Sequence, residues 1–464
     1  MALSLGRVWA RNSSAGSCRG RRSVARAAHR RAWFGEHVCT PFPPRPMPLP
    51  LPIEIVEYIL DLASAFPNLS VYLYPPYYRD LVLNDHALPL SDIKLSASSL
   101  FSLALVCKQW NATCTRRLYR CLAIVDEDIP IDALLRTLEE SQITATVSGS
   151  MPLGSLTRHL IIALSDSFVK DNESERFDRR IQRRFGSLGR LARCLPRLEI
   201  LSISIFIHNM WGLPLPYYGK NFAATVTQTC APSLLKLHLH NEALVLFSRP
   251  ELRKFLESSP NLIAITGAGV GDCIGCPATL PYLPKLKYLV VNNSDMGCCD
   301  HIGHKDDRTP LLDHIHIRQS LLSNHWVHLL SVQGARLTSI SLDLRLPPDS
   351  ENCSEYLSKF TKFCPNLSYL EICIHNWVSF PRLESLPPVE RFGIRVQSES
   401  IGADTICKAL ATIQSPSLKV IQLMSPGMFE LFASSDNVKS AWSPLVDRAF
   451  RVVDCDGQEL GPPK

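Results

Sequence analysis

A short pattern, a proline, one further residue and then L-x-x-L-x-L, recurs along the chain from residue 196 to residue 423. Its copies read PRLEILSI at 196, PSLLKLHL at 232, PNLIAITG at 260, PKLKYLVV at 284, PLLDHIHI at 310, ARLTSISL at 335, PNLSYLEI at 365, PVERFGI within 387–394 and PSLKVIQL at 416. A weaker copy, LTRHLIIAL, begins at Leu156. The first apolar residues of successive strong copies lie 22 to 36 residues apart. A near-regular period of this size is typical of a repeat architecture, in which each copy supplies one structural unit.

Each copy predicts a short strand, because alternating apolar residues bury one face of a strand and the proline ends the preceding helix. Helix-like runs such as LRKFLESS, SEYLSKFTKFC and DTICKALATIQ lie between the copies. One strand and one helix per repeat predict an α/β solenoid with a parallel sheet on its concave face, and the period is that of an irregular leucine-rich repeat. The alternative is an ordinary α/β domain whose strands happen to begin with proline.

The residues between the apolar positions of each strand are expected to project from the concave face, where solenoids bind their partners. They include Lys236, His238, His240, Tyr288, Asn292, His314, His316, Arg318, Ser341, Asp343, Tyr369, Glu371, Arg391 and Arg395. Cations and histidines outnumber acids here, so we expect a target protein with an acidic segment. Its binding should weaken with salt and strengthen below about pH 6.5, where imidazoles become charged. The alternative is that these side chains form solvated strand faces without a partner.

The chain before the repeats has a helical character. LPIEIVEYILDLA, residues 51–63, opens with a proline that the first position of a helix tolerates, and its apolar residues cover a wide arc. A second helical pattern, ASSLFSLALVCKQWNATCTRRLYRCL, follows after an aromatic and proline-rich insertion at 64–96. A short helix with more apolar surface than its own module needs is typical of one completed by another protein. A helical cap on the following domain is the alternative.

The order L-P-x-E, then I-L, then LALVCKQWN and LYRCL resembles the F-box, as found in fungal-type F-box-like proteins with a leucine-rich C-terminal region. The matching residues are Leu51, Pro52, Glu54, Ile59, Leu60, Leu103, Val106, Cys107, Lys108, Trp110, Leu118 and Tyr119. The resemblance implies a substrate-recognition subunit of an SCF-type ubiquitin ligase, which binds a Skp adaptor, and through it a cullin, and recruits a target for degradation. It implies that the adaptor contact, or the small core that presents it, is made by Leu51, Pro52, Ile55, Ile59, Leu103, Val106 and Trp110.

Residues 1–46 contain nine arginines and a single acid, Glu36, so this segment carries +8 and the rest of the chain −2 of the formal net charge of +6. We therefore expect no nucleic-acid partner for the folded part. The composition of the segment is that of a mitochondrial presequence, and the alternatives are a disordered extension or one outside the working protein. The expected localisation is the cytoplasm or nucleus, with the mitochondrion as the alternative. No apolar run reaches about 18 residues, so no membrane span is expected.

Cys273, Cys276, Cys298 and His301 lie in two segments that follow adjacent predicted strands, and such residues can ligate zinc. Their spacing matches no known finger, so we expect neither a metal nor another cofactor. The sixteen cysteines, without a secretory signal, indicate reduced and mostly buried side chains. The sequence contains no G-x-S-x-G, P-loop, Rossmann or H-E-x-x-H motif, so we expect a non-enzymatic protein.

The expected organisation is a basic extension at 1–46, a small all-α module at 47–122 and a connecting or capping segment at 123–154. The solenoid follows at 155–440, with a cap or tail at 441–464. A ligase-independent scaffold that binds proteins through the solenoid is the alternative function, and adaptor binding separates it from a ligase subunit.

Overall fold

The computed structural model describes a large part of the chain after residue 89. The described residues are 90–125, 131–165, 174–206, 215–241, 246–247, 249–267, 281–292, 309–318, 330–344, 350–377, 380, 383, 386–396, 402–415, 417–425, 431–432, 440 and 442–460. The chain divides into two compact units. The first comprises Met1–Tyr119 and Asp128–Leu134, and the second comprises Arg120–Glu127 and Leu135–Lys464.

The described part of the first unit is mainly a pair of helices, α4 (Leu90–Ala104) and α5 (Lys108–Arg120), which ends at the boundary with the second unit. They coincide with the second helical pattern of the sequence. The predicted helix at 51–63 lies outside the described residues, as does most of the insertion at 64–96.

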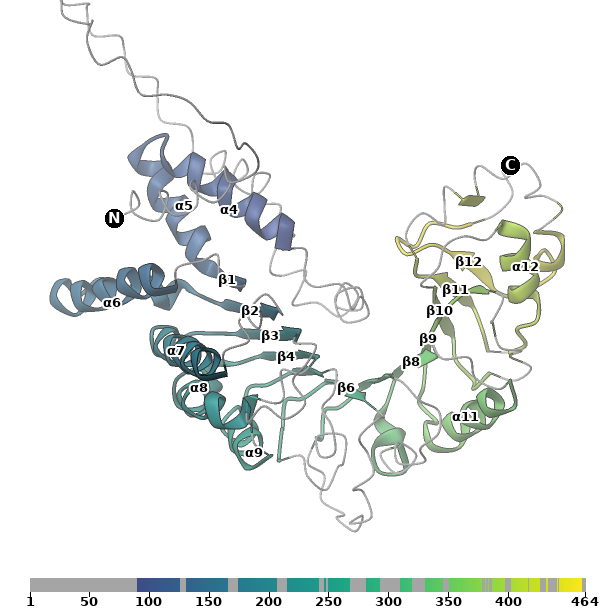
Figure 1. The fold of residues 1–464 in the computed structure, drawn as a ribbon. Helices are drawn as coiled ribbons and strands as arrows, with labels where there is room; N and C mark the ends of the chain where they lie inside the picture. Colours follow the sequence, from purple (N-terminus) through teal and green to yellow (C-terminus); the bar gives the residue numbers. More distant parts are fainter. Residues whose placement is uncertain are drawn as a thin grey trace, which may run out of the picture. The chain divides into compact units, whose positions relative to one another are not determined.

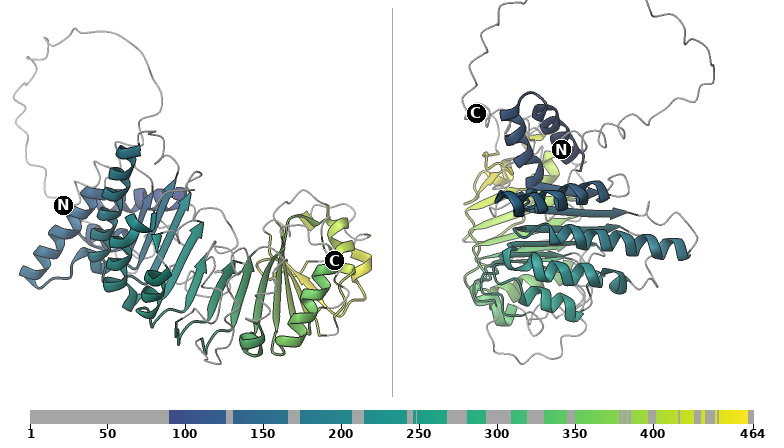
Figure 2. Two further views of the ribbon diagram at one scale, coloured as in Figure 1. Left: turned by 60° about the horizontal axis from the view of Figure 1, so that its bottom comes forward. Right: turned by 90° about the vertical axis from the view of Figure 1, so that its left-hand side faces the viewer.

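The second unit is built on a sheet of twelve parallel strands that lie side by side in chain order (Figures 1 and 2). The strands are β1 (Cys121–Val125), β2 (His159–Ser165), β3 (Ile200–Phe206), β4 (Lys236–Asn241), β5 (Ala264–Gly267), β6 (Tyr288–Asn292), β7 (His314–Arg318), β8 (Ser339–Leu344), β9 (Tyr369–Ile374), β10 (Arg391–Val396), β11 (Val420–Leu423) and β12 (Arg451–Val453). This order without crossovers, in which each strand pairs only with its neighbours along the chain, is that of a solenoid-like α/β fold.

The recurring pattern places its strands with a constant offset. Each of the nine strands β3 to β11 begins two residues after the first apolar residue of its copy. Those apolar residues are all at most 3% exposed: Leu198, Leu234, Leu262, Leu286, Leu312, Leu337, Leu367, Val389 and Leu418. The predicted parallel α/β sheet is therefore confirmed, with one strand for each copy.

Helices cover one face of this sheet (Figure 1). They are α6 (Ile131–Ser148), α7 (Ser174–Arg193), α8 (Leu215–Thr229), α9 (Arg249–Glu257), α11 (Ser350–Phe363) and α12 (Ala403–Ala411). Short 3-10 turns stand at η2 (Leu153–Leu156), η4 (Ala231–Ser233), η6 (Gly334–Arg336) and η8 (Ser443–Leu445). Fully buried phenylalanines of the helices, such as Phe222, Phe255 and Phe360, belong to the core of this unit. We call the opposite face of the sheet the inner face.

The sheet extends beyond the predicted solenoid at both ends. Strand β1 overlaps the segment 123–154, expected to be a connector or cap, and helix α6 lies within it. Strand β12 lies in the expected cap or tail at 441–464. After β12 the chain turns back, so that Leu460 N–H donates to Val452 O and Glu459 pairs with Val453 in antiparallel fashion. This return gives the last strand a partner on its outer edge.

Among the described helices, none is long and apolar enough to cross a membrane.

Candidate functional site

The helix pair of the first unit has a small core of its own. Leu100, Ala104 and Cys114 are buried, and the partly buried Leu103, Trp110 and Leu118 pack against them. At the corner between the helices, the Asn111 side-chain amide donates to the Ala104 carbonyl over 3.1 Å. This hydrogen bond satisfies a carbonyl that the end of α4 would otherwise leave without a helical donor.

The same corner exposes two adjacent apolar side chains. Leu105 is 56% exposed and Val106 is 64% exposed, and Cys107 beside them is also exposed. Their backbone N–H groups donate to Ser102 O and Leu103 O, so the final turn of α4 holds them in place. Two neighbouring aliphatic side chains presented in this way form a small surface suited to an apolar partner.

The structure sorts the predicted adaptor residues into two groups. Val106 lies at the surface, whereas Leu103 and Trp110 contribute to the small core. Leu51, Pro52, Ile55 and Ile59 lie outside the described residues. Leu105 was not among the predicted residues, although its place within the apolar run LALVC could have indicated it.

The inner face of the second unit carries histidines that contact hydroxyl groups of the neighbouring strand. His238 Nδ1 lies 2.6 Å from Thr266 Oγ1, and His314 Nδ1 lies 2.8 Å from Ser339 Oγ. The His314 ring also stacks on Tyr288, with 4.3 Å between the ring centroids. In the parallel register each of these residues stands directly opposite its partner.

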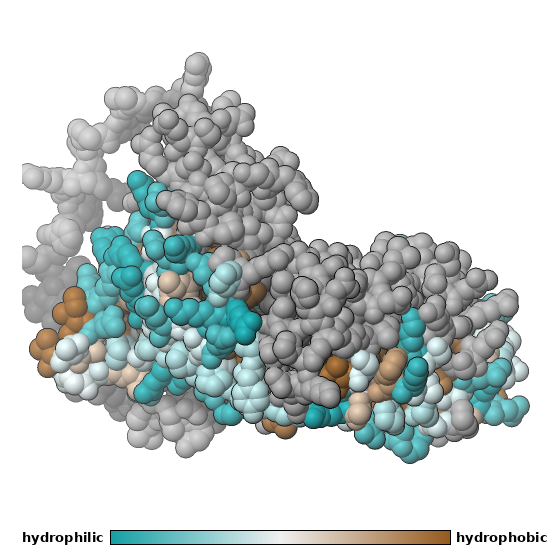
Figure 3. Space-filling view, turned by 90° about the horizontal axis from the view of Figure 1, so that it is seen from below, coloured by the Kyte–Doolittle hydropathy of each residue, from teal (hydrophilic) through white to brown (hydrophobic). Residues whose placement is uncertain are grey.

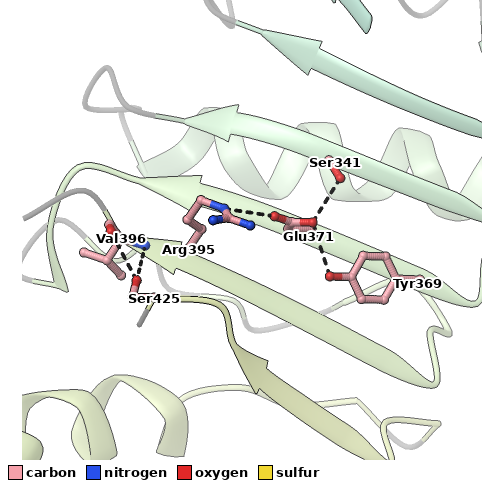
Figure 4. Close-up of polar contacts among 6 residues, drawn as sticks. All are labelled: Ser341, Tyr369, Glu371, Arg395, Val396 and Ser425. Carbon is pink, nitrogen blue, oxygen red and sulfur yellow. Dashed lines mark hydrogen bonds and ion pairs between the residues drawn. The ribbon is translucent and has the colours of Figure 1, made fainter. Parts of the chain in front are cut away.

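A buried ionic cluster occupies the inner face of strands β8 to β10 (Figure 4). The Glu371 carboxylate accepts hydrogen bonds from the Tyr369 hydroxyl at 3.2 Å and the Ser341 hydroxyl at 3.3 Å, and from Arg395 Nε at 3.4 Å. The side chain of Glu371 is 1% exposed and that of Arg395 is 9% exposed. A buried carboxylate needs such donors, since an unpaired buried charge is strongly destabilising. The cluster is therefore a fixed internal network.

Burial also shifts the pKa values of two basic groups on this face. Desolvation lowers the pKa of Lys236 to about 7, because the charged ammonium is disfavoured in a buried position. Desolvation, with the nearby Lys236 charge as a smaller cause, lowers the pKa of His159 to about 3. His159 is therefore neutral at physiological pH, and its Nε2 lies 3.1 Å from Ser202 Oγ.

The predicted target-binding residues differ widely in exposure. His314, His316, Tyr369 and Arg395 are buried, His238 and Tyr288 are half-buried, and Arg391 is exposed; the side chains of His240 and Arg318 lie outside the described part. We expect these side chains to project from the concave face toward a partner, and most of those described are buried or half-buried. Alternation along a strand indicates on which face of the sheet a side chain lies, and tertiary packing decides whether that face is exposed to solvent.

The predicted zinc ligands Cys273, Cys276, Cys298 and His301 lie outside the described residues. Within the described part of the chain, no cluster of three or more His, Cys, Asp and Glu side chains could hold a metal ion. The described cysteines are free thiols, and burial raises the pKa of Cys121, Cys230 and Cys364 to about 12. These thiols are therefore protonated, and most of the described cysteines are buried.

Comparison with protein-family models gives no match, and comparison with curated proteins finds no relative.

Proposed function

We propose that the chain is a substrate-recognition subunit of an SCF-type ubiquitin ligase. In this proposal the first unit is an F-box module that binds a Skp-type adaptor. The second unit is an irregular leucine-rich-repeat solenoid that binds the target protein. The chain would connect a target to the ligase and perform no covalent chemistry itself.

The observation that carries the proposal is the exposed Leu105–Val106 pair at the corner of the helix pair. The pair belongs to LALVCKQWN, the segment whose resemblance to the F-box is strongest in the described residues. The small core of Leu100, Ala104 and Cys114 supports the corner, so the apolar pair can be presented without a large rearrangement. Burying a large aliphatic side chain at an interface contributes about 1.5–3 kcal/mol, so two of them suffice for a substantial contact.

The test is co-purification of the full chain with a Skp-type adaptor. Leu105→Asp with Val106→Asp should abolish binding, because burying two new carboxylates without partners is costly. The matched control is Ile143→Asp with Val147→Asp, which changes two apolar residues of α6 that are 67% and 86% exposed. This control variant should bind the adaptor as the unchanged chain does.

A second variant, Pro52→Ala with Ile59→Asp, tests the part of the motif that lies outside the described residues. It should also lose the adaptor. No binding by the unchanged chain would contradict the proposal and leave a ligase-independent scaffold. Equal loss in the α6 control would mean that the corner is not the adaptor site.

A further inference from the structure

Helix α7 is unusually rich in arginine. Its twenty residues, SERFDRRIQRRFGSLGRLAR, contain seven arginines and two acids. A helix turns by about 100° per residue, so five of the arginines fall on one face of α7. We call these five the arginine row: Arg176, Arg179, Arg183, Arg190 and Arg193.

The described half of α7 shows how this row is presented. Phe185, Leu188 and Leu191 are buried, whereas Arg183 and Arg193 are exposed and the side chain of Arg190 is 51% exposed. The apolar stripe therefore faces the interior, and the described members of the row, Arg183, Arg190 and Arg193, face outward. Seen from below in Figure 3, much of the described surface in the region of α7 to α9 is hydrophilic.

The row holds one carboxylate already. Glu139 of α6 makes a bidentate pair with Arg190, whose Nη2 lies 2.7 Å from each Glu139 oxygen and whose Nε lies 3.0 Å from Oε1. This fork geometry is the one in which guanidinium groups bind carboxylates most specifically. Arg183 and Arg193 make no ion pair with any described residue, and α8 on the other side of α7 contributes Lys220 and no acid. Arg183 and Arg193 are therefore available to carboxylates from outside the chain, on either side of a position that already holds one.

We propose that the arginine row of α7 binds an acidic segment of a partner protein. From Arg183 to Arg193 the described part of the row spans about 15 Å of helix, the length of roughly four to five residues of extended peptide. A nucleic acid is the less favoured occupant, because sequence-tolerant binding of single strands uses exposed aromatic platforms. Tyr282 is the one aromatic among the large apolar side chains exposed in the described part of the chain, and it is not on α7. The proposal is independent of the ligase proposal, since it concerns the helical face of the second unit.

The probe is a fluorescent twelve-residue peptide of glutamate and glycine that carries a photo-crosslinker, added to the full chain. Arg183→Gln with Arg193→Gln should weaken binding about fivefold, since exposed charge contacts are individually weak. Binding by the unchanged chain should also weaken as sodium chloride is raised, because exposed charges are screened. The matched control is Lys362→Gln with Arg451→Gln, which removes two exposed positive charges from α11 and β12. It should bind the peptide as the unchanged chain does.

Cross-links mapped by mass spectrometry separate α7 from the other arginine-rich segment, residues 1–46. We expect cross-links within 174–193. Cross-links confined to 1–46, or equal weakening by the control variant, would overturn the proposal. The last outcome is that an oligothymidine of the same length binds more strongly than the peptide and loses this binding in the Arg183→Gln, Arg193→Gln variant. That result would identify the ligand of the row as a nucleic acid and would overturn the proposal.

Discussion

At the scale of single residues, Gly393 makes the buried ionic cluster possible. Gly393 stands opposite Glu371 in the register of β9 and β10. A Cβ atom at position 393 would overlap the Tyr369 hydroxyl and lie 3.2 Å from Glu371 Cγ. The absence of a side chain is therefore what gives the Tyr369 hydroxyl room to donate to the Glu371 carboxylate.

We predict that Gly393→Ala lowers the free energy of unfolding by about 1–3 kcal/mol, through overpacking and loss of a buried hydrogen bond. Urea denaturation measures this. Adding Tyr369→Phe should recover part of the loss, because it removes the overlapping hydroxyl. Gly402→Ala is the control, since a Cβ there meets nothing within 4 Å. Equal stability of Gly393→Ala and the unchanged chain would show that the cluster tolerates the methyl group.

Lys236 makes the stability of the second unit depend on pH. Burial lowers its folded-state pKa from 10.5 to about 7. Between these pH values the unfolded chain binds a proton that the folded chain lacks, so this residue's contribution to stability rises with pH from about 7. Below pH 7 the lysine is protonated in both states, and the cost of burying the ammonium is complete.

We predict that Lys236→Met raises the free energy of unfolding by about 1–3 kcal/mol at pH 6.5 and by less at pH 8.5. The measurement is urea denaturation of both proteins at the two pH values. The buried cysteines, whose pKa values are raised, also make stability depend on pH. Their contribution is common to both proteins and cancels when the variant is compared with the unchanged chain at each pH. A gain that is larger at pH 8.5 would contradict the assigned direction.

At the scale of elements, the start of β2 contains a polar exception to the repeat. Strand β2 begins at His159, and Thr157 holds the position that leucine or valine holds before β3 to β11. Thr157 is 0% exposed, and its Oγ1 has no hydrogen-bond partner among the described residues. The repeat therefore places a hydroxyl group where its other copies place an apolar side chain.

Thr157→Val should raise the free energy of unfolding by about 1 kcal/mol, because it keeps the shape and removes an unsatisfied buried hydroxyl. Thr157→Ala is the comparison, and it should destabilise, since it also removes a buried methyl group. Thermal denaturation of both variants would show the effect. A loss of stability in the valine variant would indicate that the hydroxyl has a polar partner after all.

The strands also show which elements a sequence pattern can find. The recurring pattern located nine of them, because a buried apolar residue and alternation occur together at one place, and in eight of the nine copies a proline precedes them. Strands β1 and β12 were missed. Strand β1 follows α5 directly without a proline, and β12 contributes only Arg451–Val453. Short edge strands are stabilised by pairing with a neighbour, which local sequence does not encode.

At the scale of the whole molecule, the extent of strand pairing varies along the sheet of the second unit. Strands β2 and β3 share seven aligned residue pairs, whereas β5 and β6 share two, Ala264 with Tyr288 and Ile265 with Leu289. In a repeat protein each unit contacts only its neighbours, so cooperativity passes through every such junction. Among the described strand pairs, β5–β6 therefore has the shortest ladder, and we expect the two halves of the sheet to separate there most easily.

We predict that native-state hydrogen exchange divides this unit into two cooperative parts, one centred on β2–β4 and one on β8–β10. Amides of β5 and β6 should exchange through the openings of lowest free energy. Leu289→Ala should increase the difference in opening free energy between the two parts. Leu201→Ala should lower mainly the opening free energy of the part centred on β2–β4. A single opening free energy for all strands would mean that the unit unfolds as one body.

The sequence by itself determined the repeat, the position of nine strands and their common face, because periodicity and proline act locally. It also indicated the helix pair, whereas the exposure of Leu105 and Val106 at its corner came from the structure. The tertiary structure decided which polar side chains are buried. His316, Glu371 and Arg395 occupy positions that alternation assigns to the inner face, yet each is less than about a tenth exposed. The structure likewise showed Arg183 and Arg193 to be exposed and without an ion partner among the described residues. Burial depends on what the rest of the chain brings to a face, and no local pattern carries that information.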